Sequence, residues 1–364
     1  MRKLAAWIAY VALAVVLLLL PLFVDWGLGR TWVRILDFTL LYVMLALGLN
    51  IVVGYAGLLD LGYVAFYAVG AYLYALLASP HFGLHLPFWL VLPLGATVAA
   101  TFGVLLGAPT LRLRGDYLAI VTLGFGEIIR IFLNNLNAPV NVTNGPQGIN
   151  LIDPIRFGAF SLNETHSLGG LALGAVHQYY YLFLLLTLAV VFISLRLQDS
   201  RIGRAWVAIR EDEVAAEAMG INTRNIKLLA FAMGATFGGV SGGLFAGFQG
   251  FVSPESFNLL ESIMILCMVV LGGMGHIPGV VLGAFLLTVL PEALRYVGPL
   301  QQHYLHRVIV DPANLRLLLF GLALVVVMLL RPAGILPSPQ RRRELKPDAD
   351  IAAQERASLY DSEK

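Results

Sequence analysis

The sequence predicts an all-α membrane protein: a polytopic bundle of about ten transmembrane helices, with one short helix on the cytoplasmic side. Two observations lead to this prediction. The 364 residues are 59% hydrophobic and 13% charged, about half the charged share of a soluble domain. The apolar residues also come in blocks of about twenty, the length that crosses a hydrocarbon core roughly 30 Å thick. A water-soluble fold would have to expose several of these blocks, so it is excluded.

Each block is taken as one span. The first follows Arg2 and Lys3 and is longer than the apolar region of a signal peptide, which is about 7–15 residues, so we expect a retained span. The eighth is short, and with the Gly-rich residues after it can form a broken or re-entrant element instead of a plain helix. The spans are expected at 4–24, 35–53, 55–78, 86–108, 117–133, 179–195, 228–252, 259–271, 278–297 and 315–330.

The basic residues give the orientation, since short loops rich in Lys and Arg favour the cytoplasm. Basic residues collect before the first span, in the loop at 109–116, in the segment 196–227 and after the last span. With ten spans these groups lie on one side, so both termini are expected in the cytoplasm. The segment 134–178 falls outside and carries only Arg156. Arg residues at 30, 34, 307 and 316 depart from this pattern.

Three regions follow along the chain. Residues 1–34 hold the first span and the first outer loop, 35–335 form the transmembrane core, and 336–364 form a polar tail. The tail has six basic and six acidic residues from Ser338 on and little apolar periodicity. We expect it to be a disordered cytoplasmic tail.

Glycine is frequent inside the spans, most densely at 234–243. Small residues allow close helix approach in lipid, so helix packing is favoured there over substrate contact. The segment around Gly54 and Gly57 is also similar to the segment around Gly272 and Gly275. Gly-interrupted helices in repeated halves often lie near a transporter's binding site.

Polar residues inside spans are costly and often functional. Glu127 lies three residues before Arg130, and Glu292 three before Arg295, so each pair shares a helix face. Such groups can line a water-filled path for a zwitterion, or neutralise each other near the outer membrane face. For Asp60 a path role and a structural role stay equally open. The candidate translocation path is Asn50, Asp60, Glu127, Gln249 and Glu261.

The cytoplasmic segment 196–227 mixes charge with small apolar residues. Ala208, Val214, Ala215, Ala218 and Met219 can share one helical face, and Gly220 is a natural stop. We expect a single surface helix that docks another protein, because an ordinary solvated loop needs no run of Ala. The residues expected to carry this contact are Gly203, Arg204, Arg210, Glu211, Asp212, Glu213, Ala215, Ala216 and Gly220.

Several functions find no support. A nucleotide-binding P-loop needs Gly-x-x-x-x-Gly-Lys-Ser/Thr, and none of the four Lys (3, 227, 346 and 364) has that context. No triad, His-Glu-x-x-His or paired-carboxylate motif appears. The seven His are scattered and Cys267 has no partner. There is no basic stripe for nucleic acid. We therefore expect no enzyme, metal or cofactor on this chain.

Several motifs resemble the LivM-type permease family of branched-chain amino acid ABC importers, over about residues 35–335. One departure stands out: the wider importer pattern places Glu six residues before the Gly, whereas Glu213 lies seven before Gly220. The matching motifs are 54–72 (beginning Gly54-Tyr55-Ala56-Gly57-Leu58-Leu59-Asp60-Leu61-Gly62), 112–130 (beginning Arg112-Leu113-Arg114-Gly115-Asp116-Tyr117), Thr143-Asn144-Gly145-Pro146-Gln147-Gly148-Ile149, 203–220 and Val270-Leu271-Gly272-Gly273-Met274-Gly275.

The resemblance implies a channel-lining subunit in the bacterial inner membrane. Its implied partners are a second permease subunit, two ATPase subunits that use ATP, a periplasmic substrate-binding protein that selects the substrate, and membrane lipid. The segment 203–220 would be the ATPase-coupling segment. Two alternatives stay open: a urea or short-chain amide permease of the same family, and a self-contained ion-coupled transporter with Asp60 and Glu127 as ion carriers. A scaffold without a transport role would not need polar residues inside the membrane.

Overall fold

The computed structural model describes residues 2–110, 113, 115–158, 160–168 and 171–295, and near the C-terminal end 318, 321, 322, 325, 326, 329 and 334–336. Long helices dominate this part of the chain, and the strands are two or three residues long. The helices are α1 (Arg2–Leu28), α2 (Arg30–Asn50), α3 (Val64–Leu77), α4 (Phe88–Thr110), α5 (Asp116–Asn135), α6 (Ala175–Gln198), α7 (Arg201–Glu211), α8 (Glu213–Ala218), α9 (Thr223–Gln249), α10 (Leu259–Gly272) and α11 (Ile277–Arg295).

Six helical segments in the described residues are long and apolar enough to cross a membrane. They are α2 with its π-helical end η1 (Ile51–Tyr55), α4, α6, α9, α10 with the short η3 (Pro254–Ser256), and α11. Apolar stretches in α1 and α3 are shorter. The chain is therefore a multi-pass helical membrane protein. The expected tenth span, 315–330, and the tail lie largely outside the described residues.

Glycines let α9 pass through the middle of the bundle in close contact with α3 and α4. A Cβ on Gly70 of α3 would overlap the Gly239 carbonyl oxygen, and one on Gly242 would overlap the Tyr67 carbonyl oxygen. On the α4 side, a Cβ on Gly103 would lie 2.7 Å from the Phe231 carbonyl oxygen. This backbone contact confirms the helix-packing interpretation of the Gly-rich segment.

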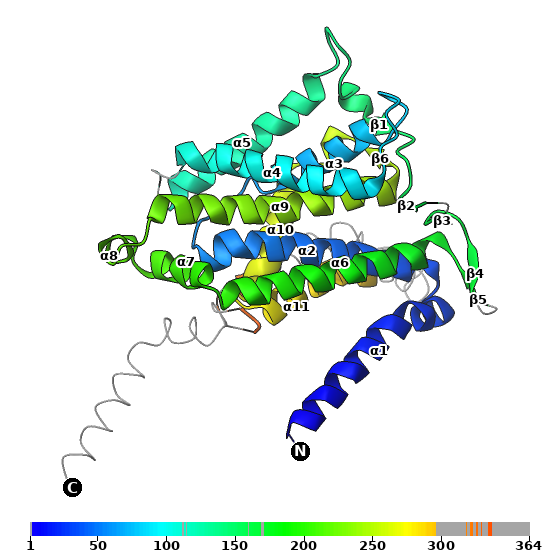
Figure 1. Ribbon diagram of the computed structural model, residues 1–364, viewed down its shortest axis with the longest axis horizontal. Helices are drawn as coiled ribbons and strands as arrows, with labels where there is room; N and C mark the ends of the chain where they lie inside the picture. The colour runs from blue at the N-terminus through cyan, green and yellow to red at the C-terminus, as the bar shows by residue number, and fades with distance from the viewer. Residues whose placement is uncertain are drawn as a thin grey trace.

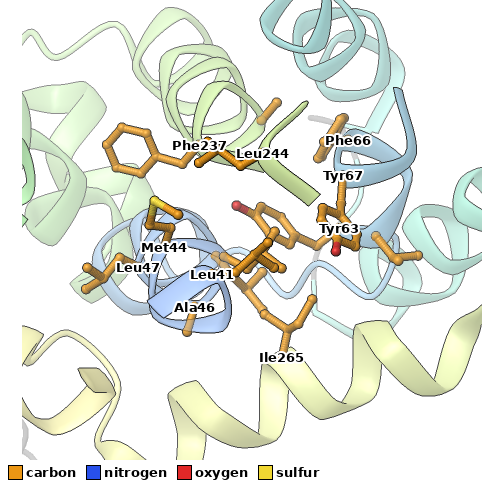
Figure 2. Packing of buried hydrophobic residues seen from close by; sticks show 14 of the residues in the cluster. Leu41, Met44, Ala46, Leu47, Tyr63, Phe66, Tyr67, Phe237, Leu244 and Ile265 are labelled. Atoms are coloured by element: carbon orange, nitrogen blue, oxygen red, sulfur yellow. The ribbon is translucent and has the colours of Figure 1, made fainter. Parts of the chain in front are cut away.

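Tyr63 stands at the centre of the hydrophobic core. Figure 2 shows its ring among side chains from α2, α9 and α10, including Leu41, Leu244 and Ile265. Its hydroxyl donates to the Gly234 carbonyl oxygen at 3.0 Å. A buried tyrosine needs such a partner for its polar end, so this bond ties the start of α3 to α9.

The expected span 55–78 is wrong over residues 56–63, about its first third. Helix α3 begins only at Val64, and residues 56–63 are non-helical and mostly buried. Gly57 has φ +69°, and side chains satisfy the backbone that a helix would have paired. Asp60 Oδ1 accepts from Gly62 N at 2.9 Å, and Thr122 Oγ1 accepts from Leu61 N at 3.0 Å. Irregular backbone at membrane depth is tolerated when it is buried in protein in this way.

The segment 134–178 contains small strands at one end of the bundle, opposite α7 and α8 (Figure 1). Its Asp153 is tied to the end of α3: Asp153 N donates to the Ala78 carbonyl oxygen at 2.7 Å, and Tyr74 Oη donates to the Asp153 carbonyl oxygen at 3.0 Å. The strand pairs are all antiparallel: β1 (Ile149–Asn150) with β6 (Phe251–Val252), β2 (Arg156–Phe157) with β3 (Phe160–Ser161), and β4 (His166–Leu168) with β5 (Leu171–Leu173).

Candidate functional site

The segment between α6 and α9 forms two helices, so the expected single surface helix is wrong. Ser200 caps α7, its hydroxyl accepting from Gly203 N at 3.1 Å. Asp212 then has extended backbone and ends α7, while its Oδ1 accepts from Val214 N at 2.8 Å and Ala215 N at 3.0 Å. A capping carboxylate of this kind starts a new helix. Gly220, with φ +85°, follows the end of α8.

Two contacts fix this segment to α9. The Trp206 indole is buried and its Nε1 donates to the Ile226 carbonyl oxygen at 2.7 Å. The Lys227 ammonium, also buried, pairs with Glu213 Oε1 at 2.5 Å. Through these contacts α7 and α8 are both attached to the start of α9, a long helix of the core.

The outer surface of α8 carries exposed apolar side chains beside the exposed Glu217. Val214 is 65% exposed and Met219 84% exposed, and Ala215 and Ala218 between them are also exposed. Ala216, one of the residues expected to make contacts, is buried against the bundle instead. This apolar tip, defined by Val214, Ala215, Ala218 and Met219, is a surface fit for contact with another protein.

A pocket of about 440 Å³ lies between α7 and the glycine segments of the core. Arg210 crosses it, donating from Nη1 to the Gly54 carbonyl oxygen at 2.7 Å. A Cβ on Gly57 would overlap the Arg210 side chain, so this close approach requires glycine. The lining residues include Gly54, Tyr55, Asp199, Arg204, Arg210 and Gly275.

The two similar glycine segments meet in space. Gly275 N donates to Asn50 Oδ1 at 2.8 Å, and a Cβ on Gly54 would lie 2.6 Å from Gly275 N. The likeness seen in the sequence thus marks two helix interruptions that pack against each other: η1 with residues 56–63, and the turn between α10 and α11.

The five candidate path residues contact different partners. Asn50 holds Gly275, and Asp60 holds the turn at Gly62. Tyr42 Oη donates to Glu261 Oε2 at 2.9 Å, and Arg34 Nη2 donates to Gln249 Oε1 at 2.8 Å. Glu127 pairs with Arg130, and the second predicted pair, Glu292 with Arg295, forms at 3.2 Å. These pairs confirm the shared helix faces, and the path role of the five residues stays a prediction.

Asp37 is a buried polar residue that is not among the candidates predicted from the sequence. It lies in α2, is fully buried, and neither carboxylate oxygen has a hydrogen-bond partner among the described residues. At the end of α1, Asp25 Oδ2 lies 3.4 Å from Nε2 of the buried His177. The signal was present, since Asp37 stands inside an expected span, where a lone carboxylate is rare.

Buried glycine contacts and interrupted helices are typical of multi-pass membrane transport proteins. The comparisons with known proteins agree. The family described as branched-chain amino acid transport system, permease component, matches residues 31–328. This chain belongs to that family, and so is a transport subunit.

Three relatives illustrate the similarity. The high-affinity branched-chain amino acid transport system permease protein LivM of Escherichia coli K12 is 44% identical over 343 residues, covering 90% of this chain and 76% of the relative. LivH of Salmonella typhimurium, named for the same kind of system, is 26% identical over 82% of this chain and 92% of its own. A probable LivM of Methanocaldococcus jannaschii is 26% identical over 82% of this chain and 90% of its own. No solved structure matches significantly.

Proposed function

We propose that this chain lines one half of the channel of an ATP-driven importer that moves leucine, isoleucine and valine across the bacterial inner membrane by alternating access. Both LivM and LivH relatives align with most of this chain, which supports a second permease subunit of the same fold as its partner. Two ATPase subunits would supply the energy from ATP, and a periplasmic protein would supply the amino acid.

The apolar tip of α8 carries this proposal. Exposed Val214 and Met219 would enter a groove on the ATPase, while the Lys227–Glu213 and Trp206–Ile226 contacts transmit its movement to α9. Arg210 extends the same connection to Gly54 in the core. The tip is small and apolar, the chemistry of a buried contact with a partner.

The test is co-purification of the ATPase with the permease in detergent. Val214→Asp places a charge in the proposed contact and is expected to abolish co-purification and leucine-stimulated ATP hydrolysis in proteoliposomes. Val140→Asp is a matched control for co-purification, because Val140 has the same side chain at 66% exposure and lies after α5 at the end of the bundle opposite α8. Co-purification unchanged by Val214→Asp, or equally lost in both variants, would overturn the docking role of α8.

The segment 134–178 would face the binding protein. Leu151 supports this, since it is 77% exposed and holds φ +57°, an unusual backbone state for a non-Gly residue that often marks a functional site. Deleting the segment would also remove the buried Ile152 and Ile155, so a point change is sharper. Leu151→Glu is expected to reduce the stimulation of ATP hydrolysis by the binding protein while basal hydrolysis persists. Full stimulation would contradict this assignment.

The orientation is tested by labelling. In a Cys267→Ser background, a cysteine at position 214 is expected to react with a membrane-impermeant maleimide only after the cells are opened, and a cysteine at position 140 in intact spheroplasts. The reverse pattern would place α8 outside and both termini in the periplasm. Uptake of labelled leucine by this chain alone in liposomes would favour the ion-coupled alternative instead.

A further inference from the structure

A small apolar pocket lies between α3, α5 and the start of α10, apart from the pocket under α7. It measures about 120 Å³ and is lined by Leu61, Val64, Leu123, Gly126, Glu127, Phe257 and Leu259. A cavity of about 150 Å³ with aliphatic and aromatic walls can hold benzene. A pocket somewhat smaller suits a branched alkyl group, such as the side chain of leucine or valine.

The pocket is held at a fixed width by backbone contact. A Cβ on Gly126 would lie 3.2 Å from the Gly62 Cα, and a Cβ on Gly62 would overlap the Thr122 carbonyl oxygen. The Thr122 hydroxyl also accepts from Leu61 N. The non-helical segment 56–63 and α5 therefore form one rigid wall, which gives the pocket a defined size.

Arg130 joins Glu127, which lines the pocket, to a second carboxylate, Glu255. Arg130 is bidentate on Glu127, with Nε 3.1 Å from both carboxylate oxygens, and its Nη1 reaches Glu255 Oε1 at 3.3 Å. Two carboxylates thus share one guanidinium, leaving a net negative charge for an ammonium group. The planar fork of Arg130 is already occupied by these two carboxylates.

A net negative charge next to an apolar pocket matches an amino acid, which carries an ammonium group beside its apolar side chain. We propose that this pocket, near the end of the bundle that carries the strands, is an entry subsite that receives the side chain of a branched-chain amino acid. Glu127 and Glu255, whose two negative charges share the single positive charge of Arg130, face its ammonium group. The inference rests on the proposed function and adds to it a specificity-determining site on the permease itself.

Photo-leucine, whose side chain carries a diazirine, tests the occupancy directly. The complete transporter with its binding protein would be loaded with photo-leucine, illuminated and analysed by peptide mass spectrometry. Adducts are expected on the pocket walls, at 61–64, 123 and 257, and excess leucine should suppress them. Adducts found only elsewhere, or adducts that leucine does not suppress, would overturn the proposal.

Transport variants separate this inference from the function on which it rests. Leu123→Phe fills the pocket and is expected to lower leucine uptake about tenfold or more, with a smaller loss for alanine, since a change of pocket volume is worth roughly 10–200-fold in discrimination. Ile128→Phe is the control, because Ile128 lies on α5, is 63% exposed and lines no part of the pocket. Equal losses of leucine and alanine uptake would contradict the subsite, whereas a wild-type complex that carries no branched-chain amino acid would contradict the proposed function.

Discussion

Asn50 and Gly275, 225 residues apart, are joined by a 2.8 Å hydrogen bond from Gly275 N to Asn50 Oδ1. The bond connects the end of α2 to the turn between α10 and α11. The adjacent Gly54 carbonyl oxygen accepts from Arg210 of α7. Two helix interruptions and the surface segment therefore meet at one place. A movement of α7 would be transmitted to the core helices there.

Asn50→Ala should weaken this junction. The variant leaves the buried Gly275 N–H without its acceptor, which costs about 1–3 kcal/mol. We expect a lower melting temperature of the detergent-solubilised protein and a smaller ratio of uptake to ATP hydrolysis. Asn135→Ala is the control, because Asn135 is exposed and donates only to a carbonyl oxygen of its own helix. Equal melting temperatures for Asn50→Ala and wild type would contradict the structural role of the bond.

Gly70→Ala should prevent the close contact of α3 with α9. Its Cβ would collide with the Gly239 backbone, and rigid backbone on both sides leaves no side chain to move. We expect little monodisperse protein after detergent extraction. Gly124→Ala on α5 meets no heavy atom within 4 Å and should be neutral or slightly stabilising, by up to about 1 kcal/mol. A normal yield of Gly70→Ala would mean that α3 and α9 lie further apart.

The sequence located the long helices because lipid allows few other structures. Blocks of apolar residues gave α2, α4, α6, α9 and α11 with edges a few residues off. The apolar pattern predicts a helix over residues 56–63 as well, because apolarity alone does not separate a buried extended segment from a helical one. The interruption depends on Gly57 and on the bonds made by Asp60 and Thr122, and Thr122 lies in another helix.

In the segment 196–227, too, the local sequence does not determine where a helix is interrupted. Its position, its charged start and its stop at Gly220 followed from the residues. Its division at Asp212 did not, because the residue can extend a helix or cap a new one, and the packing of Trp206 and Lys227 against α9 decides between them. The same packing turns Ala216 inward and Val214 outward.

Lys227→Met should loosen α8 from α9. The Lys227 ammonium is buried, while Glu213 is partly exposed, so losing the pair should cost about 1–3 kcal/mol, between the values for surface and buried pairs. ATP hydrolysis is expected to continue with less uptake per ATP. The double variant Lys227→Met/Glu213→Leu, which removes both members of this pair, should recover stability but not coupling. A single variant with wild-type uptake per ATP would show that the pair transmits nothing.

Tyr180→Phe should detach part of α1. Pro21 stands inside α1 and lacks an N–H, so the carbonyl oxygen of Leu17, four residues earlier, loses its helical donor. In lipid an unpaired carbonyl is costly, and Tyr180 Oη donates to it at 3.0 Å, with Tyr181 Oη on Leu18 at 3.1 Å. Removing the Tyr180 hydroxyl should cost about 1 kcal/mol.

The missing N–H of Pro21 predicts how the cost of removing the Tyr180 hydroxyl changes. In Pro21→Ala, residue 21 regains an N–H that pairs with Leu17, so the Tyr180 hydroxyl becomes dispensable. A double-mutant cycle on melting temperature should therefore show a smaller effect of Tyr180→Phe in the Pro21→Ala background, with a coupling of about 0.5–3 kcal/mol. Additive effects would mean that Tyr180 holds α1 by ring packing alone. The Leu17 carbonyl oxygen would then contribute nothing to the contact between α1 and α6.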